Sequence, residues 1–142
     1  MEAEKQLTYS VRTLRKDALG SESTCKEATI PLDTGVQGRS DAFNPAELLL
    51  AALSACMIKG IERVAPILKF GFRGIEVRLS GARQGSPPKM ERIDYEILVD
   101  TDEPERRLEL LHDNVRKFGT VFNTVAPGTE LKGALRRAVT GD

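Results

Sequence analysis

Residues 44–56, NPAELLLAALSAC, predict a capped and buried helix whose motif ends on a cysteine. Asn44 is a favoured N-cap residue, and Glu47 three positions later completes a capping box. Pro45 suits the first helical position, because its missing N–H has no partner there. The residues that follow are apolar on every face, which is typical of a buried helix rather than a surface one.

The expected helix has a thin profile and a defined end. It should run from Asn44 to about Val64, because Pro66 lacks the backbone N–H that a further turn needs. A helix that is buried all round must be covered from several sides, and a chain of 142 residues has limited material to do so. A partner subunit would supply the rest. The small residues that allow close approach are Ala51, Ala52, Ser54, Ala55 and Gly60.

The segments beside this helix predict strands, because apolar and polar residues alternate in them. Before the helix we expect strands around Leu7–Val11 and over residues 24–32, and then a loop rich in Gly, Ser and Asp over residues 33–43. After it, Ile75–Leu79 and Ile93–Val99 predict two strands joined by the segment GARQGSPPK.

A second helix and a last strand complete the pattern. Asp102 with Glu105 repeats the capping pattern, and apolar residues recur at helical spacing over residues 108–118. Gly119 stands where a C-cap glycine belongs, and residues 129–136 predict a strand. The order of strands, buried helix, strands, helix and strand predicts one α+β domain over the whole chain.

Composition and charge exclude several classes of function. The 21 basic and 21 acidic residues balance and form no long block, so we expect neither a nucleic-acid nor a membrane partner. The uncharged apolar stretch Leu48–Ile58 is far below the roughly 20 residues of a membrane-spanning helix. The start MEAEKQLTYS lacks the apolar core of a secretory signal, and two cysteines make no disulfide framework, so we expect a cytoplasmic protein.

The chemistry-bearing residues are few. Cys25, Cys56 and His112 lie far apart without ligand spacing, so no metal or cofactor is expected. A cysteine in an Ala/Leu-rich helix is most often a small buried residue, and one in mid-helix needs a nearby cation to become a reactive thiolate. Lys59 and Arg63 share the helix face of Cys56, although basic residues near a helix C-terminus need no function. The other candidate cations are Arg12, Arg15 and Arg39.

The pattern N-P-x-E-L-L-x-A-A-L-x-x-C from Asn44 to Cys56 resembles the osmotically inducible protein C and organic hydroperoxide resistance (OsmC/Ohr) superfamily. The Gly-rich loop before it, the two strands after it and the segment LHDNVRKFGTVFNTV look like that family's layout. The resemblance implies an intertwined homodimer, in which the central helices are buried between sheets and a thiol peroxidase site lies near the subunit interface.

The resemblance also implies roles for single residues. Cys56 takes the place of the peroxidatic cysteine, whose thiolate attacks the terminal oxygen of an organic hydroperoxide and leaves an alcohol and a sulfenic acid. A glutamate early in the helix and an arginine from the N-terminal strands assist it. Glu47 fits the first role, although its capping role explains it equally well, and in the best-characterised branch the glutamate stands at the position of Ala46. The arginine is Arg39, Arg12 or Arg15.

One expected partner is missing from the sequence. The family segment Y-C-P-V-S-N-T, which carries the cysteine that resolves the sulfenic acid, matches FGTVFNT at residues 118–124, so that Gly119 replaces the resolving cysteine. An external thiol would then reduce Cys56. Cys25 is better explained as a lone strand cysteine than as a substitute, and His112 as a solvated or packing residue than as a general base.

Two functions follow from the resemblance. The first is a thiol-dependent peroxidase of peroxiredoxin type with one site cysteine, Cys56, reducing organic hydroperoxides in an oxidative-stress response. The alternative is a non-catalytic dimer of the same fold that binds an apolar small molecule in its inter-subunit pocket, with Cys56 as part of the lining. A purely structural or partner-binding role is a third reading, because fold alone does not carry activity.

Overall fold

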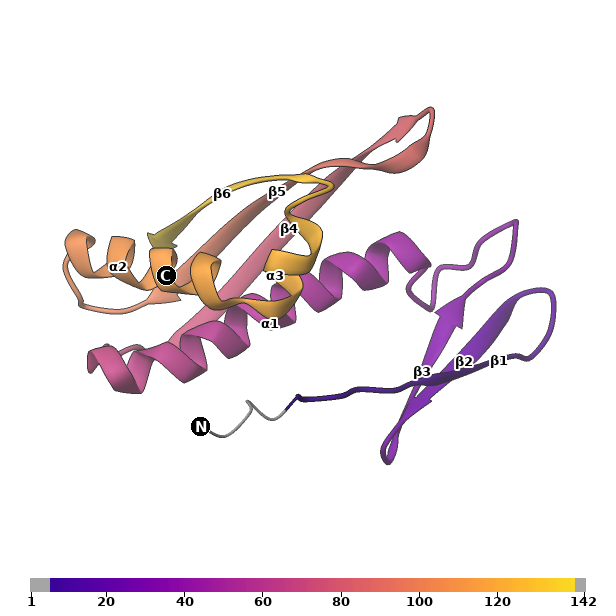
Figure 1. The fold of residues 1–142 in the computed structure, drawn as a ribbon, viewed down its shortest axis with the longest axis horizontal. Coiled ribbons are helices and arrows are strands. Elements are labelled where there is room, and N and C mark those ends of the chain that lie inside the picture. Colours follow the sequence, from indigo (N-terminus) through magenta and orange to yellow (C-terminus); the bar gives the residue numbers. More distant parts are fainter. Residues whose placement is uncertain (1–5, 140–142) are drawn as a thin grey trace. The chain divides into compact units, whose positions relative to one another are not determined.

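The computed structural model describes residues 6–139 and divides the chain into two compact units, residues 1–48 and 49–142. The boundary falls in the first turn of the long helix α1 (Pro45–Leu68), and each unit is described by itself. Over the described residues, the element order is three strands, α1, two strands, two helices and a strand (Figure 1). The predicted α+β class and element order are confirmed, with one additional short helix. The single domain remains a prediction.

The first unit contains an antiparallel sheet in the order β1-β2-β3. Its strands are β1 (Arg12–Arg15), β2 (Gly20–Cys25) and β3 (Ala28–Asp33). The predicted run over residues 24–32 is therefore wrong as a single strand. Lys26, with a φ of 56°, turns the chain back after Cys25, so that Cys25 pairs with Ala28 across a tight hairpin.

The predicted strand around Leu7–Val11 is also wrong, and the register gives the reason. Arg12 pairs with Thr24, only one residue before the end of β2. The residues before Arg12 therefore extend past the hairpin, where β2 no longer offers hydrogen-bonding partners. Alternation of apolar residues was present, but pairing decides whether a strand forms.

The first unit buries little apolar surface. None of its described apolar side chains belongs to the buried core, and Tyr9, Val11 and Phe43 are 81%, 69% and 53% exposed. A sheet of three strands needs a covered hydrophobic face to be stable in water. These side chains therefore require cover from another part of the protein or from a partner.

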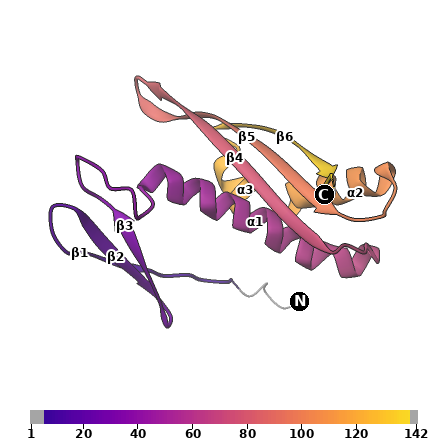
Figure 2. The same cartoon turned by 180° about the vertical axis from the view of Figure 1, so that it is seen from behind.

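The second unit contains a mixed sheet in the order β4-β5-β6. The long strands β4 (Gly74–Gly85) and β5 (Pro88–Asp100) form an antiparallel hairpin, with only Ser86 and Pro87 between them. The last strand, β6 (Glu130–Arg137), is close to the predicted range but runs parallel to β5 (Figure 2).

The helices of the second unit cover one face of this sheet (Figures 1 and 2). They are α1, α2 (Glu105–Phe118) and the short α3 (Thr120–Val125). From Ile93 to Val99, every second residue of β5 is buried in the core that they share, which is why the sequence alternates there. The fully buried large side chains include Leu53, Met57, Ile61, Ile93, Ile97, Leu108 and Leu111.

Helix α1 continues past the proline that was predicted to stop it. Pro66 lies in its last turn, and the helix ends at Leu68. Lys69 then adopts a left-handed conformation with a φ of 55°, while the N–H of Phe70 donates to the carbonyl of Ala65 over 2.8 Å. This is a Schellman closure with a lysine in the usual place of glycine, and buried Phe70 anchors it.

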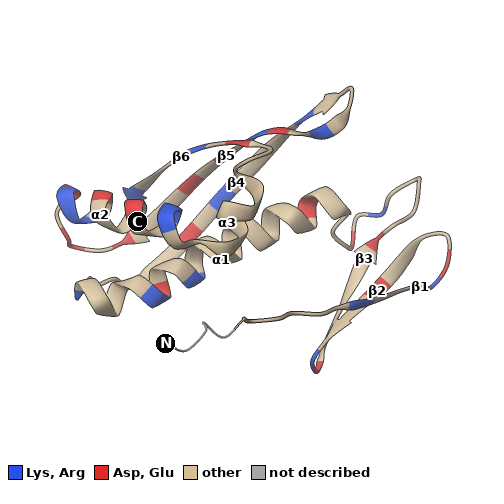
Figure 3. Cartoon of the chain, viewed as in Figure 1, with Lys and Arg blue, Asp and Glu red and all other residues tan. Residues whose placement is uncertain are grey.

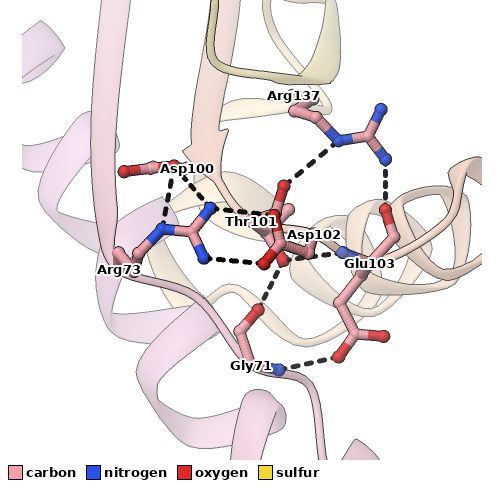
Figure 4. Close-up of polar contacts among 7 residues, drawn as sticks. All are labelled: Gly71, Arg73, Asp100, Thr101, Asp102, Glu103 and Arg137. Carbon is pink, nitrogen blue, oxygen red and sulfur yellow. Dashed lines mark hydrogen bonds and ion pairs between the residues drawn. The ribbon is translucent and has the colours of Figure 1, made fainter. Parts of the chain in front are cut away.

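The start of α2 also differs from the prediction. Asp102 does not cap the helix, because its carboxylate accepts hydrogen bonds from Arg73 over 3.0 and 3.2 Å. Arg73 also binds Asp100, so that its guanidinium joins the residues at the end of β5 to the start of β4 (Figure 4). The buried Thr101 donates to the carbonyl of Gly71 in the same cluster. Tertiary contacts thus replace the local cap.

Charged residues are absent from most of the first half of α1, and the helix buries one face, so its burial on all sides remains a prediction (Figure 3). Between Glu47 and Lys59, α1 has no charged residue, whereas acidic and basic residues alternate along the outward-facing positions of the sheet. Over residues 6–139, no helix has both the length and the apolar character needed to cross a membrane.

Candidate functional site

The N-terminus of α1 carries the predicted capping box. The side-chain oxygen of Asn44 accepts a hydrogen bond from the backbone N–H of Glu47 over 2.8 Å, and the Glu47 carboxylate accepts one from the N–H of Asn44 over 3.0 Å. These reciprocal bonds satisfy two backbone donors that a helix start leaves free. The capping reading of Glu47 is therefore confirmed.

Glu47 and Cys56 stand nine positions apart on the same helix. Nine residues make about two and a half turns, which places the two side chains on opposite sides of α1. Glu47 therefore does not reach the thiol of its own helix. Its predicted assistance to Cys56 stays a prediction that requires a glutamate from elsewhere, such as a second copy of the chain.

Cys56 lies in the middle of α1 with a free, partly buried thiol. Its neighbours Leu53 and Met57 are fully buried, so the residue stands at the edge of the core rather than inside it. Ser54, two residues before Cys56, donates its hydroxyl hydrogen to the carbonyl of Leu50 on its own helix. The intermediate burial of Cys56 leaves part of the residue accessible to solvent.

Gly119 packs directly against this sulfur. A Cβ atom at Gly119 would lie 3.2 Å from the Sγ of Cys56, 3.0 Å from the Cβ of Phe122 and 3.1 Å from the carbonyl oxygen of Val115. The residue is buried where α2 ends and α3 begins. In the family that this chain resembles, the position of Gly119 carries the resolving cysteine. The structure places this position beside Cys56, as the match of the two segments implies.

The glycine is required for space and not for backbone conformation. The predicted C-cap position of Gly119 is confirmed, but its φ of −78° and ψ of 118° are values that any residue can adopt. The chain turns here into α3, which the sequence analysis did not predict. Its six residues, TVFNTV, are too few for helical periodicity to be visible.

The basic side chain of Arg63 binds the same junction between α2 and α3. The guanidinium of Arg63, two turns after Cys56 on α1, donates to the carbonyl of Phe118 over 3.1 Å. The ammonium of Lys117 lies 5.4 Å from the centre of the Phe118 ring, which is itself half exposed. Phe118, the residue before Gly119, therefore contacts two basic side chains, Arg63 at its carbonyl and Lys117 at its ring.

The other candidate arginines belong to the first unit, so the structure describes them separately from Cys56. Arg39 forms a two-pronged ion pair with Asp41, whose hydrogen bonds raise the pKa of Arg39 and lower that of the carboxyl. Arg12 is exposed on β1, and its carbonyl accepts a hydrogen bond from the Thr24 hydroxyl. The predicted roles of Arg39, Arg12 and Arg15 remain predictions.

The remaining candidates have structural explanations. Cys25 is a free cysteine at the end of β2, beside the hairpin turn. His112 binds the hydroxyl of Tyr95 over 2.7 Å, and burial together with the positive charge of Arg116 lowers its pKa. Burial raises the pKa of Tyr95. Over residues 6–139, no group of three or more potential metal-binding side chains is present.

The end of β3, where the loop before α1 begins, contains a buried carboxylate that the sequence pattern did not indicate. Asp33 is 7% exposed, and one of its oxygens accepts a hydrogen bond from the N–H of Arg39. Its other oxygen has no partner among the described residues. Gly38, with a φ of 80°, lets the loop fold around this side chain. A Gly- and Asp-rich loop was expected here, but burial of one aspartate has no local signal.

Comparison with known proteins gives a family match and several structures of similar fold. The family model described as "OsmC-like protein" matches residues 38–132, which is about two thirds of the chain. A search of curated proteins found no match. Among solved structures, the OsmC-like protein of Mycoplasma pneumoniae has a TM-score of 0.87 at 16% identity, covering 95% of this chain and 100% of that one.

Two further solved structures have names that mention hydroperoxides. The organic hydroperoxide resistance protein OsmC of Legionella pneumophila has a TM-score of 0.73 at 18% identity, covering 96% of this chain and 100% of that one. The organic hydroperoxide resistance protein OhrB of Bacillus subtilis has a TM-score of 0.64 at 18% identity, covering 91% and 98%. At such low identity, these likenesses establish the fold.

Proposed function

We propose that this chain, which belongs to the OsmC-like protein family, uses Cys56 to reduce organic hydroperoxides. The structural neighbours named as organic hydroperoxide resistance proteins support a role in the response to osmotic or peroxide stress. The observation that carries the proposal is the free thiol of Cys56, held in mid-helix with Gly119 against one side of it. A structural cysteine would be enclosed in the core, as Met57 is.

The reaction would proceed in three balanced steps. The Cys56 thiolate attacks the terminal oxygen of the hydroperoxide, the O–O bond breaks, and an alcohol leaves after taking up a proton. The sulfur is now a sulfenic acid. A thiol from solution attacks it, releases water and forms a mixed disulfide, and a second thiol then frees Cys56 and leaves as an external disulfide.

An external reductant follows from the neighbourhood of the sulfur. The second unit contains no other cysteine, and the position facing Sγ is a glycine. The half-exposed Phe118 ring, next to Gly119, favours a substrate with an apolar organic group over hydrogen peroxide.

We further propose that two copies of the chain form a homodimer. The first unit leaves Tyr9, Val11 and Phe43 exposed, and α1 exposes the small residues Ala52 and Ala55. Apolar side chains in such number require cover, and a second copy of the chain is the partner that the family resemblance implies. Sedimentation velocity should give a dimer at micromolar concentration, and a monomer would contradict this part of the proposal.

The proposal is tested by steady-state consumption of cumene hydroperoxide with a small dithiol in excess. We expect turnover by the wild-type protein and by Cys25→Ser, and none above background by Cys56→Ser. Equal rates for the wild type and Cys56→Ser would refute the peroxidase. The same protein should then be tested for binding of apolar small molecules, the function in which Cys56 only lines a pocket.

A further inference from the structure

We infer that Arg63 is a positioning residue for the Cys56 thiolate, a role that rests on the proposed function. The first step is helical geometry. Seven residues cover about 700°, only some 20° short of two full turns, so that Arg63 lies on the same side of α1 as Cys56. Its long side chain extends from there to the junction between α2 and α3.

The second step is the shared contact. Arg63 donates to the carbonyl of Phe118, and the next residue, Gly119, is the one whose Cβ position lies 3.2 Å from the Cys56 sulfur. The guanidinium and the thiol therefore contact adjacent residues of one segment. A displacement of this segment would move the group that packs on the sulfur.

The third step is electrostatic. The C-terminus of a helix carries partial negative charge on its free carbonyls, and α2 ends beside Cys56 with the carbonyl of Val115 3.1 Å from the Gly119 Cβ position. Such carbonyls disfavour a thiolate. Arg63 binds the terminal carbonyl of α2 directly, so its positive charge offsets this effect at the place where it acts.

Few other charged groups lie on the elements that pack around Cys56. On α1, Lys59 is exposed on the Cys56 face, and Glu62 lies about 120° away around the helix. The short α3 contributes no charge, and the core face of β5 contributes only the hydroxyl of Tyr95. The titratable and charged groups in the second half of α2 are His112, Asp113, Arg116 and Lys117.

The test measures thiolate formation without any hydroperoxide. In a Cys25→Ser background, the rate of Cys56 alkylation by iodoacetamide is followed by intact mass from pH 5 to 9. Arg63→Met should raise the pH midpoint by roughly half a unit to one unit, because a partly solvated cation has been removed. Arg63→Lys should stay near the parent, since it keeps the charge.

Lys59→Met is the matched control, because it removes the same charge from the same face without a bond to the junction. A shift for Lys59→Met as large as that for Arg63→Met, or no shift for Arg63→Met, would overturn the inference. Faster amide exchange at residues 118–120 alone would indicate packing only and would likewise count against it. An Arg63-dependent profile in a protein that consumes no hydroperoxide would refute the proposed function and not this inference.

Discussion

The substitution Gly119→Cys should create a disulfide with Cys56. In a disulfide, an S–S bond of about 2.04 Å places the sulfur of one cysteine roughly 3 Å from the Cβ of the other. The distance from the Gly119 Cβ position to the Cys56 sulfur is 3.2 Å, so the geometry requires little movement. The substitution would supply inside the chain the thiol that the proposed cycle takes from solution.

The stability of the variant has two opposing contributions. The new bond closes a loop of about 63 residues, for which the chain-entropy estimate is about 4 kcal/mol. The added Cβ meets Phe122 at 3.0 Å and the Val115 carbonyl at 3.1 Å, and such overpacking costs about 1–3 kcal/mol. Reduced Gly119→Cys should therefore be less stable than the wild type, and the oxidised form more stable than the reduced form.

The assay combines peptide mapping with urea unfolding in the presence and absence of reductant. Mapping should find residues 56 and 119 linked after one equivalent of cumene hydroperoxide. Gly119→Ser separates overpacking from thiol chemistry. Gly128→Cys is a matched control, because its Cβ would meet nothing within 4 Å. If Gly119→Cys keeps two free thiols at residues 56 and 119 under conditions that oxidise Cys56, the arrangement of α1 and the α2–α3 junction described above is wrong.

Three further predictions concern stability. Asn44→Ala should cost about 1 kcal/mol of unfolding free energy and Asn44→Asp much less, because aspartate also caps; equal losses in urea titrations would contradict the capping box. Thr101→Val should lower the unfolding free energy by about 1–3 kcal/mol, because it leaves the buried hydrogen-bond partners of Thr101 unsatisfied. Arg73→Met should cost less, because the ion pairs of Arg73 are exposed and contribute little. The reverse order in urea titrations would contradict this prediction. Folding lowers the pKa of His112 below its ordinary value of 6.5, so the contribution of this residue to the free energy of unfolding is complete above pH 6.5 and is lost as the pH falls. His112→Gln should therefore flatten the decline in unfolding free energy between pH 7 and 5. An unchanged slope would refute this prediction.

The elements with strong local signals were predictable from the sequence. The start of α1 was identified because Asn44, Pro45 and Glu47 each act on backbone groups within one turn. The second central strand was identified because every second residue of β5 from Ile93 to Val99 is buried. In both cases the physical cause operates over a few residues of the chain, so it leaves a pattern that can be read directly.

The errors arose where distant residues decide the outcome. Asp102 had the spacing of a helix cap, but Arg73, distant in sequence, binds its carboxylate. Pro66 did not end α1, because its neighbours Val64 and Ala65 are buried and the chain closes only at Lys69. The parallel pairing of β6 with β5 likewise depends on the path of the chain through α2 and α3.

The candidate site was predictable only in part. The role of Cys56 and the match of Gly119 to the resolving position came from a family resemblance. The structure adds that a Cβ at Gly119 would lie 3.2 Å from the Cys56 sulfur. The bond from Arg63 to the Phe118 carbonyl joins residues 55 positions apart and had no signal beyond a shared helix face. The site roles of Arg12, Arg15 and Arg39 remain predictions.

The central claim is that Cys56 is a nucleophile toward organic hydroperoxides. Its most direct measurement is the intact mass of the reduced protein within seconds of adding one equivalent of cumene hydroperoxide, with Cys56→Ser and Cys25→Ser in parallel. We predict a gain of about 16 Da, the mass of one oxygen atom, in the wild type and in Cys25→Ser but not in Cys56→Ser. A Cys56 that stays reduced, or reacts no faster than Cys25, would contradict the account.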